Sequence, residues 1–400
     1  MNLLYLNYGP VDPLTGGVAR VTAAQADYFE KKLGYKTWYL GVPDETKRAD
    51  ASRQFYLPAG ANAHYDAPEN IEFYKNLLKE YKIDVVINQA CWNIAVSRLS
   101  YAARSANVKL LSPFHNAIVN FIANTRDSWH ARLQRRHLGF VTPLLSLGIV
   151  KKTFLLRNER RWRKHFRDLC AYSDRLILLS EQFKPELAQY LGKSCPPNVI
   201  AISNPYPFAE VGAVDLAAKE KEILFVGRFD SLQKRVDLAI RIWAKLHRDF
   251  PDWTFRLLGD GPDFDKTVAL AKKLKAERVI FEGFKNAEEY YKKASLLMMT
   301  STHEGFGMVL VEALGAGCIP CAFQSFASVT DIIDDGKNGV LVKPFDCGLY
   351  AKKLANLMKN DTLRRQMAAN AIEKARKFST EKIYKKWIDV IEDLCPQAKP

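Results

Sequence analysis

Short apolar runs alternate with amphipathic stretches along the chain, a pattern typical of parallel sheets flanked by helices. In the first half, the expected elements are strand Leu3–Tyr8, helix Val18–Lys32, strands Asp84–Asn88, Val108–Ser112 and Leu176–Ser180, helix Glu181–Leu191 and strand Val199–Ile202. Asn204-Pro205 then ends the last strand, because the residue before a proline disfavours continued regular structure. These elements predict a first α/β domain.

The second half shows the same rhythm more clearly. Its expected elements are strand Ile223–Val226, helix Val236–Phe250, strand Phe255–Leu258, helix Phe264–Leu274, strand Val279–Glu282, helix Ala287–Ala294, strand Leu296–Thr300 and helix Met308–Ala316. Weak periodicity over Pro205–Leu216 marks the linker to this second α/β domain. Apolar residues at helical spacing from Ile383 to Leu394 predict a final amphipathic helix that covers another surface.

Composition narrows the class of protein. A length of 400 residues suits two domains, with three as the alternative. The 48% apolar and 26% charged residues exclude a disordered or fibrous chain. The 59 basic and 44 acidic residues give a net charge of +15, which favours nucleic acid, an anionic membrane surface or a phosphorylated substrate as a partner.

Cysteine usage and hydropathy bear on the compartment. Seven scattered cysteines do not fit a disulfide scaffold and favour a reducing compartment. Cys318 and Cys321 form a CxxC in an apolar run, where we expect small buried side chains. Met1–Tyr8 is strand-like and reaches Pro10 too early for a signal peptide, and no apolar stretch has the roughly 18 residues of a membrane span. We therefore expect a protein that is neither exported by this route nor membrane-spanning.

One segment, Arg126–Arg167, stands apart by its charge. It carries 12 basic residues against two acidic ones, and it surrounds an uncharged apolar run at Leu138–Val150. Three interpretations stay open: an exposed basic helix with leucines toward the core, a patch that lies on an anionic membrane, and a nucleic-acid site.

The most informative motif is HEGFGMVLVEAL at residues 303–314. Glu304 falls in the loop after the Leu296–Thr300 strand, at the sheet edge where open α/β sheets bind ligands. Glu312 lies in an otherwise apolar helix, where an unpartnered charge is costly, so we expect it to face a ligand. The glycines between them permit close backbone approach, and the helix N-terminus suits a phosphate. The alternative is a glycine turn with one capping and one surface glutamate.

Three further features also follow predicted strands. Arg228 and Lys234 lie in the motif FVGRFDSLQKR at residues 225–235, within reach of a phosphate, although taken alone such residues are more often solvated surface charges. Gly16-Gly17 opens a helix and lets amides approach a diphosphate, but the loop is not GxGxxG, which argues against a dinucleotide oxidoreductase. His115 follows the Val108–Ser112 strand; a bare turn and a structural histidine are the alternatives for these last two.

Asp263 and Asp265 form a DxD that is able to hold a divalent metal on a nucleotide diphosphate. They follow Gly261-Pro262 at a helix start, so helix capping and pairing with the helix dipole are the favoured explanation. Because Arg228, Lys234 and backbone amides already suit the phosphates, we expect no metal and no cofactor.

Together these motifs resemble the retaining glycosyltransferases of the GT-B fold, family 4. The resemblance is strongest over Glu222–Lys343 and rests on Val226-Gly227-Arg228 with Lys234, Leu258–Pro262, Gly283-Phe284, Glu304 with Glu312, and Gly336–Gly339. It is weaker at Gly16-Gly17, His115, Ser180 and Asn204-Pro205, where the family has Asn-Gly.

The resemblance implies two Rossmann-like, doubly wound parallel-sheet domains that face a central cleft. The first, acceptor-side domain would span residues 1–205 and be completed by a C-terminal helix at about 380–397 that crosses back to it; the donor domain would span 206–379. By the same resemblance, the expected catalytic residues are Glu304, His115, Arg228 and Lys234. The expected donor-binding residues are Gly16, Gly17, Arg228, Lys234, Gly283, Phe284, Glu304, Gly305, Phe306, Gly307, Met308, Val309 and Glu312.

The expected roles follow the resemblance as well. Arg228 and Lys234 would bind the donor diphosphate, Glu312 the ribose hydroxyls and Glu304 the transferred sugar, while His115 would sit beside the reacting sugar. The enzyme would move a hexose or N-acetylhexosamine from a nucleotide diphosphate sugar, with UDP as the expected nucleotide, to an acceptor hydroxyl with retained configuration.

We expect the acceptor to be a glycan or lipid-linked oligosaccharide of cell-surface polysaccharide synthesis. The enzyme would be metal-independent and cytoplasmic, with attachment to the cytoplasmic face of a membrane through residues 126–167, and it would bind no nucleic acid. Two rival classes remain: a nucleotide-sugar epimerase or other NAD-dependent enzyme, which the absent GxGxxG disfavours, and a nucleic-acid-binding protein, which predicts salt-dependent binding to generic DNA or RNA.

Overall fold

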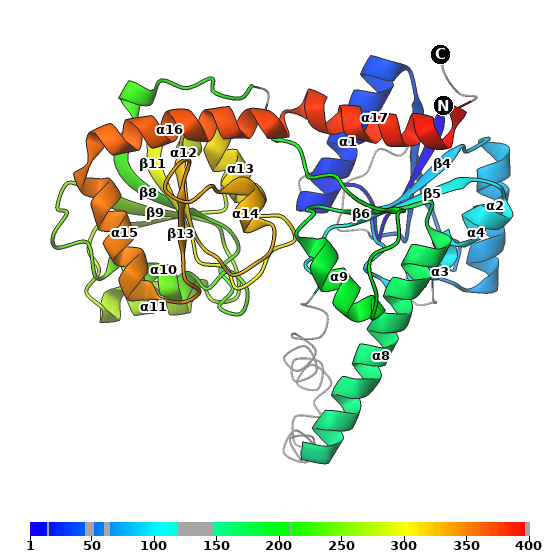
Figure 1. Ribbon diagram of the computed structural model, residues 1–400, viewed down its shortest axis with the longest axis horizontal. Coiled ribbons are helices and arrows are strands. Elements are labelled where there is room, and N and C mark those ends of the chain that lie inside the picture. The colour runs from blue at the N-terminus through cyan, green and yellow to red at the C-terminus, as the bar shows by residue number, and fades with distance from the viewer. Residues whose placement is uncertain (14–15, 45–51, 60–64, 119–147, 209, 397–400) are drawn as a thin grey trace. The chain divides into compact units, whose positions relative to one another are not determined.

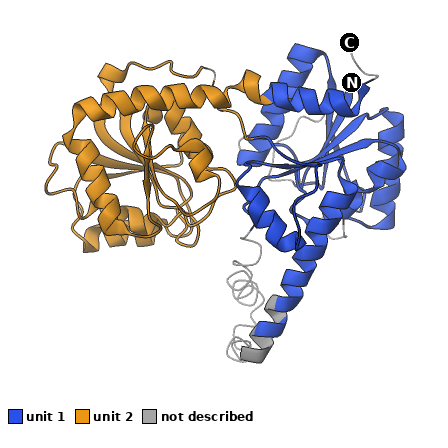
Figure 2. Ribbon diagram, viewed as in Figure 1, with its two compact units in different colours: residues 1–202, 384–400 blue, residues 203–383 orange. Residues whose placement is uncertain are grey.

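The computed structural model describes residues 1–13, 16–44, 52–59, 65–118, 148–208 and 210–396. Their contacts divide the chain into two compact units (Figure 2). Unit 1 comprises Met1–Ile202 with Tyr384–Pro400, and unit 2 comprises Ser203–Ile383. Each unit is built on one sheet whose strand pairs are all parallel, and helices cover the sheet (Figure 1).

The sheet of unit 1 has the strand order β3-β2-β1-β4-β5-β6-β7. Its strands are β1 Asn2–Leu6, β2 Lys36–Gly41, β3 Gln54–Tyr56, β4 Val85–Asn88, β5 Lys109–Phe114, β6 Arg175–Leu178 and β7 Val199–Ala201. Five of these confirm predicted strands within a few residues at each end. Strands β2 and β3 were not expected.

Apolar side chains of the helices at residues 68–80, 94–100 and 102–105 of unit 1 pack with strand residues in one core. The helices of unit 1 are α1 Gly17–Leu33, α2 Pro68–Glu80, α3 Ile94–Ser100, α4 Ala102–Ser105, α8 Gly148–Tyr172, α9 Phe183–Leu191 and most of α17 Thr380–Leu394. Tyr384 of α17 packs on Tyr28 and Phe29 with ring centroids 4.8 and 5.8 Å apart. The predicted C-terminal helix therefore exists, and its apolar stripe is buried on the first domain.

Among the side chains of α8 whose burial is described, the buried ones lie near its C-terminal end. His165, Phe166 and Leu169 are buried, whereas the exposed positions of the helix include Arg157, Arg160 and Arg161. Figure 1 shows its N-terminal part extending away from the sheet of unit 1. Among the described residues, no helix combines the length and the apolar character needed to cross a membrane.

The sheet of unit 2 has the strand order β10-β9-β8-β11-β12-β13. Its strands are β8 Glu220–Val226, β9 Thr254–Leu258, β10 Val279–Gly283, β11 Ala294–Met299, β12 Ile319–Phe323 and β13 Val340–Val342. The helices are η2 Leu216–Ala218, α10 Val236–Trp243, α11 Phe264–Lys273, α12 Glu288–Lys293, α13 Met308–Gly315, α14 Val329–Ile332, α15 Cys347–Lys359, α16 Asp361–Ala375 and η3 Arg376–Phe378.

In unit 2 the structure confirms the prediction for the two cysteines and corrects the length of one predicted helix. Cys318 and Cys321 are free and fully buried beside and within β12, as predicted, and burial raises the pKa of Cys318 to about 12. The predicted helix Val236–Phe250 is too long, because α10 ends at Trp243. Leu246 and Phe250 are still buried in the turns that follow, so the apolar spacing continues beyond the helix itself.

Candidate active site

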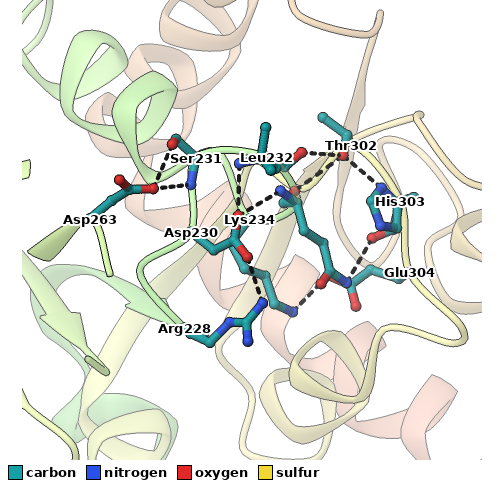
Figure 3. A network of polar contacts seen from close by, with 10 residues as sticks. Arg228, Asp230, Ser231, Leu232, Lys234, Asp263, Thr302, His303 and Glu304 are labelled. Carbon is teal, nitrogen blue, oxygen red and sulfur yellow. Dashed lines mark hydrogen bonds and ion pairs between the residues drawn. The ribbon is translucent and has the colours of Figure 1, made fainter. Parts of the chain in front are cut away.

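Lys234 and Glu304 form an ion pair at the carboxyl edge of the second sheet (Figure 3). The Nζ of Lys234 lies 2.7 Å from Oε1 of Glu304, and the two side chains are only 18% and 10% exposed. The hydroxyl of Thr300 donates to the carbonyl of Lys234 at 2.9 Å and so fixes the loop after β8 to the end of β11. Since a largely buried charge is costly without its partner, each of these two groups depends on the other.

Arg228 lies at the same edge, two residues after β8 ends at Val226. Its Nη2 donates to Oδ2 of Asp230 at 2.5 Å, while its side chain remains 63% exposed. Asp230 is itself held, because its other carboxylate oxygen accepts the amide of Leu232 at 2.8 Å. The guanidinium is therefore oriented from one side and open to an anion on the other (Figure 3).

Helix α13 begins beside this pair. Gly307 is its N-cap with φ of 95°, a conformation that favours glycine. The first-turn amides of Met308 and Val309 have no acceptor within the helix, and the positive end of the helix dipole adds to their attraction for an anion. The loop residues Gly305 and Phe306 join this N-terminus to Glu304, and Phe306 is buried at 3% exposure.

The strand ends around the site approach each other closely. Gly259 follows β9 with φ of 137°, and a Cβ there would lie 1.9 Å from the carbonyl oxygen of Gly227. A side chain at residue 259 would thus push the Arg228 loop out of place. This requirement explains the glycine that follows β9.

Glu312 has a protein partner that the sequence reasoning missed. It is 4% exposed in the middle of α13, and its Oε2 accepts the hydroxyl of Tyr291 at 2.8 Å. We expected the charge to be offset by a ligand alone. Tyr291 comes from α12, which the sequence predicted only as a helix, so no spacing signal linked it to Glu312.

Gly283 and Phe284 close strand β10 in a turn. Gly283 has φ of 71°, and Phe284 is 83% exposed, the most exposed of the large apolar side chains among the described residues. The ring is therefore open to a stacking partner.

Asp263 was predicted to cap a helix with its side chain, and this prediction is wrong. Asp263 is the N-cap of α11, but its carboxylate bonds no amide of that helix. Oδ2 instead accepts the amide and hydroxyl of Ser231, at 2.8 and 2.5 Å, and Oδ1 accepts Lys266. These bonds, that from Lys266 first, lower the pKa of Asp263 to about 2. Asp263 thus ties the β8 loop to α11, a contact that local sequence does not reveal.

The predicted residues of unit 1 lie at the carboxyl edge of its own sheet. Gly16 caps α1 with Gly17 as its first residue, and a Cβ on either would meet nothing within 4 Å. His115 directly follows β5, and its Nε2 lies 2.5 Å from Oε1 of Gln89, which follows β4. Burial lowers the pKa of His115 to about 4, so the imidazole is neutral at pH 7.

Sequence reasoning missed Gln89 and His303. Gln89 directly follows the predicted strand Asp84–Asn88, so its place at the ligand edge was a usable signal. His303 bonds through Nδ1 to the hydroxyl of Thr302 at 2.8 Å, and burial lowers its pKa. Within the described residues, no group of three or more His, Cys, Asp or Glu side chains is arranged to hold a metal ion.

Comparison with known proteins shows which part of the chain is similar to them. Residues 210–374 match the family model described as glycosyl transferases group 1. Over 226 residues the chain is 27% identical to the amylovoran biosynthesis glycosyltransferase AmsD of Erwinia amylovora, covering 55% of this chain and 62% of AmsD. It is also 24% identical over 259 residues, 64% of this chain and 70% of the relative, to an α-1,4-N-acetyl-D-galactosaminyltransferase of Campylobacter jejuni whose name includes a GalNAc-containing, diphosphoundecaprenol-linked oligosaccharide.

A solved structure extends the likeness to the whole fold. HepE of Anabaena in complex with UDP superposes with a TM-score of 0.72 at 17% identity, covering 98% of this chain and 100% of HepE. The first five curated relatives are matched over only 23% to 65% of their own lengths.

The two parallel-sheet domains and the returning C-terminal helix define a protein of the GT-B fold. Residues 210–374, which contain the Lys234–Glu304 pair, are similar to the group 1 glycosyl transferases.

Proposed function

We propose that this protein is a retaining glycosyltransferase that moves a hexose or N-acetylhexosamine from a UDP-sugar to an acceptor hydroxyl. The acceptor would belong to a glycan or a lipid-linked oligosaccharide of cell-surface polysaccharide synthesis. The observation that carries the proposal is the Lys234–Glu304 pair beside Arg228 and the N-terminus of α13, within the segment that matches the family. AmsD and the Campylobacter relative support the substrate class, and the UDP complex of HepE supports the nucleotide.

The charges of the site suit a departing diphosphate. Arg228 offers an exposed guanidinium, Lys234 a compact ammonium, and α13 two amides at its positive end. Such preorganised groups stabilise negative charge where it develops as the sugar–phosphate bond breaks. Glu304 would accept a hydrogen bond from the transferred sugar, and the departing phosphate oxygen would take the proton of the attacking hydroxyl. Lys234 would then exchange part of its contact with Glu304 for the phosphate.

A donor screen tests the proposal. The purified protein is incubated with UDP-, GDP- and ADP-linked glucose, galactose and N-acetylhexosamines, and release of the nucleoside diphosphate is measured with and without candidate acceptors. We expect release from at least one UDP-sugar, lost in the Lys234→Ala variant. Release from none of the donors, together with no binding of UDP, would contradict the proposal.

Attachment to an anionic membrane belongs to the same proposal, in a form revised by the structure. Residues 138–147 of the apolar run lie outside the described part of the chain, so the proposal rests on α8. Arg157, Arg160 and Arg161 are exposed at i, i+3 and i+4 spacing, which places them on one helix face. Each such cation near an anionic surface contributes about 1 kcal/mol.

The structure also removes one cation from this surface. Arg163 bonds Glu159 at 2.7 Å and the carbonyls of Gln189 and Tyr190 at 3.1 Å, so it fastens α8 to α9. Its replacement would disturb the fold, and it does not belong in a test of membrane binding.

Co-sedimentation with vesicles tests whether the exposed arginines of α8 bind an anionic membrane. The Arg157→Ser, Arg160→Ser, Arg161→Ser triple variant is compared with a control that replaces the exposed Lys32, Lys75 and Lys79 of unit 1 by serine. We expect the first to lose salt-sensitive binding to phosphatidylglycerol vesicles and the control to keep it. Equal sedimentation of both variants would contradict the membrane role of α8.

A further inference from the structure

The carboxyl edge of the first sheet carries aromatic side chains in addition to the predicted residues. Tyr8 lies two residues past the end of β1, and Trp92 lies past the end of β4. These strands are hydrogen-bonded neighbours with Leu6 opposite Asn88, so both aromatic residues follow the sheet edge where α/β domains bind ligands. We name Tyr8, Tyr65 and Trp92 the aromatic patch.

The ring of Tyr8 is held in place yet open. It stacks on Tyr65 with centroids 5.5 Å apart at 26°, and it contacts Trp92 at 5.5 Å and 38°. The hydroxyl of Tyr65, which is 8% exposed, donates a hydrogen bond to the carbonyl of Tyr8. Tyr8 nevertheless remains 50% exposed. Because its orientation is already set by two neighbouring rings, a ligand that stacks on it pays little ordering entropy.

Neutral hydrogen-bonding groups adjoin the patch. Gln89 lies three residues before Trp92, in the turn that follows β4, and it pairs with His115 after the neighbouring strand β5. His115 is neutral at pH 7, because burial lowers its pKa to about 4. Along this edge an exposed aromatic ring is therefore accompanied by an uncharged donor–acceptor pair, of which Gln89 is buried at 2% exposure.

This combination matches the chemistry of a sugar ring. A pyranose presents C–H groups on one face and hydroxyls around its rim, and it carries no charge that a lysine or arginine would have to meet. Aromatic rings bind such apolar faces by dispersion and by their negative ring face, while neutral polar groups satisfy the rim. Resting on the proposed function, we propose that Tyr8 and Trp92 form the stacking subsite for a sugar ring of the acceptor.

Saturation-transfer NMR on the full chain tests this subsite with defined probes. The probes are methyl α-glucoside, methyl α-galactoside and methyl α-N-acetylgalactosaminide, with uridine as the competing stacking ligand. We expect at least one glycoside to bind through its ring C–H protons. Tyr8→Ala should weaken its affinity about 2- to 12-fold, the range that an aromatic contact contributes, whereas Tyr8→Phe should keep it.

Two controls separate this idea from the proposed function. Tyr172 is also exposed, at 45%, but it ends α8 next to the start of β6, at the opposite edge of the sheet, so Tyr172→Ala should bind like wild type. UDP affinity, measured by calorimetry, should be unchanged in Tyr8→Ala, since the cationic groups proposed to bind the diphosphate lie in unit 2.

The other results separate the proposed function from the stacking subsite. Absence of UDP binding in wild type would overturn the proposed function but not a glycoside effect of Tyr8. When UDP binding is normal, three results would each overturn the stacking subsite. These are no binding of any glycoside, equal glycoside binding by Tyr8→Ala and wild type, and binding of uridine alone at the patch. A folded Tyr8→Ala protein is verified by its unchanged melting temperature.

Discussion

The carboxyl edges of the two sheets are built from different chemistry. In unit 2 the edge holds Arg228, Lys234 and Glu304, with the N-terminus of α13 beside them. In unit 1 the groups that we place at the edge are neutral: the Gln89–His115 pair and the exposed ring of Tyr8. These groups thus carry charge in unit 2 and no charge in unit 1.

The two edges also differ in whether they lie inside the residues that match the family model. The cationic edge lies in short motifs within residues 210–374, which match the family model. Under the proposed function it binds a nucleotide diphosphate, whose charges are the same whatever sugar is attached. An acceptor varies from one glycan to the next. The Gln89–His115 pair and the aromatic patch lie in unit 1, outside the residues that match the family model.

The largest expected effect comes from removing charge at the edge of unit 2. Lys234→Ala or Arg228→Ala should lower turnover about 100- to 1000-fold, because each cation faces a developing anion. Steady-state kinetics with the best UDP-sugar measure this, and Lys272→Ala, which removes an exposed lysine from α11, serves as the control. Turnover above a third of wild type in both variants would show that the charges of this edge do not act on the leaving group.

The two glutamates should differ in what they affect. Glu312→Gln should weaken UDP binding about 10-fold or more, since a hydrogen bond to a charged group contributes about 1.5 to 3 kcal/mol. Glu304→Gln should lower turnover by a similar factor with a smaller change in UDP affinity. Calorimetry and kinetics on both variants decide the assignment; loss of UDP binding only in Glu304→Gln would reverse it.

The neutrality of the other edge is itself measurable. An NMR titration of wild type, with His115→Gln to assign the signal, should give His115 a pKa of about 4. Since an unfolded histidine titrates near pH 6.5, the unfolded state binds more protons in the window from about 6.5 down to 4. The free energy of unfolding should therefore fall as pH falls through this window. A pKa near 6.5 in the folded protein would contradict the lowering of the pKa by burial at this edge.

The smallest expected effect is that of chelation. Asp263 is occupied by Ser231 and Lys266, and cationic side chains already serve the phosphates, so turnover should be unchanged after exhaustive treatment with EDTA. Activity that is lost with EDTA and restored by magnesium or manganese would place a metal where we infer only protein charge.

The sequence predicted those features that depend on residues close together in the chain. Alternating apolar runs located most strands, and Glu304, Arg228 and Lys234 stood in short motifs directly after them. Contacts from distant segments left no such pattern: the Tyr291–Glu312 bond joins α12 to α13, and Asp263 bonds Ser231 across 32 positions. Strand β3 has only three residues, which is too short for periodicity to reveal.

Titration of UDP into wild type, Arg228→Ala, Lys234→Ala and Lys272→Ala by calorimetry tests the central claim most directly, because it asks whether the cationic edge of unit 2 binds a nucleoside diphosphate. We predict binding by wild type and Lys272→Ala, and about 10-fold or weaker binding by the other two variants. Equal affinity in all four proteins, or no binding by wild type, would contradict it.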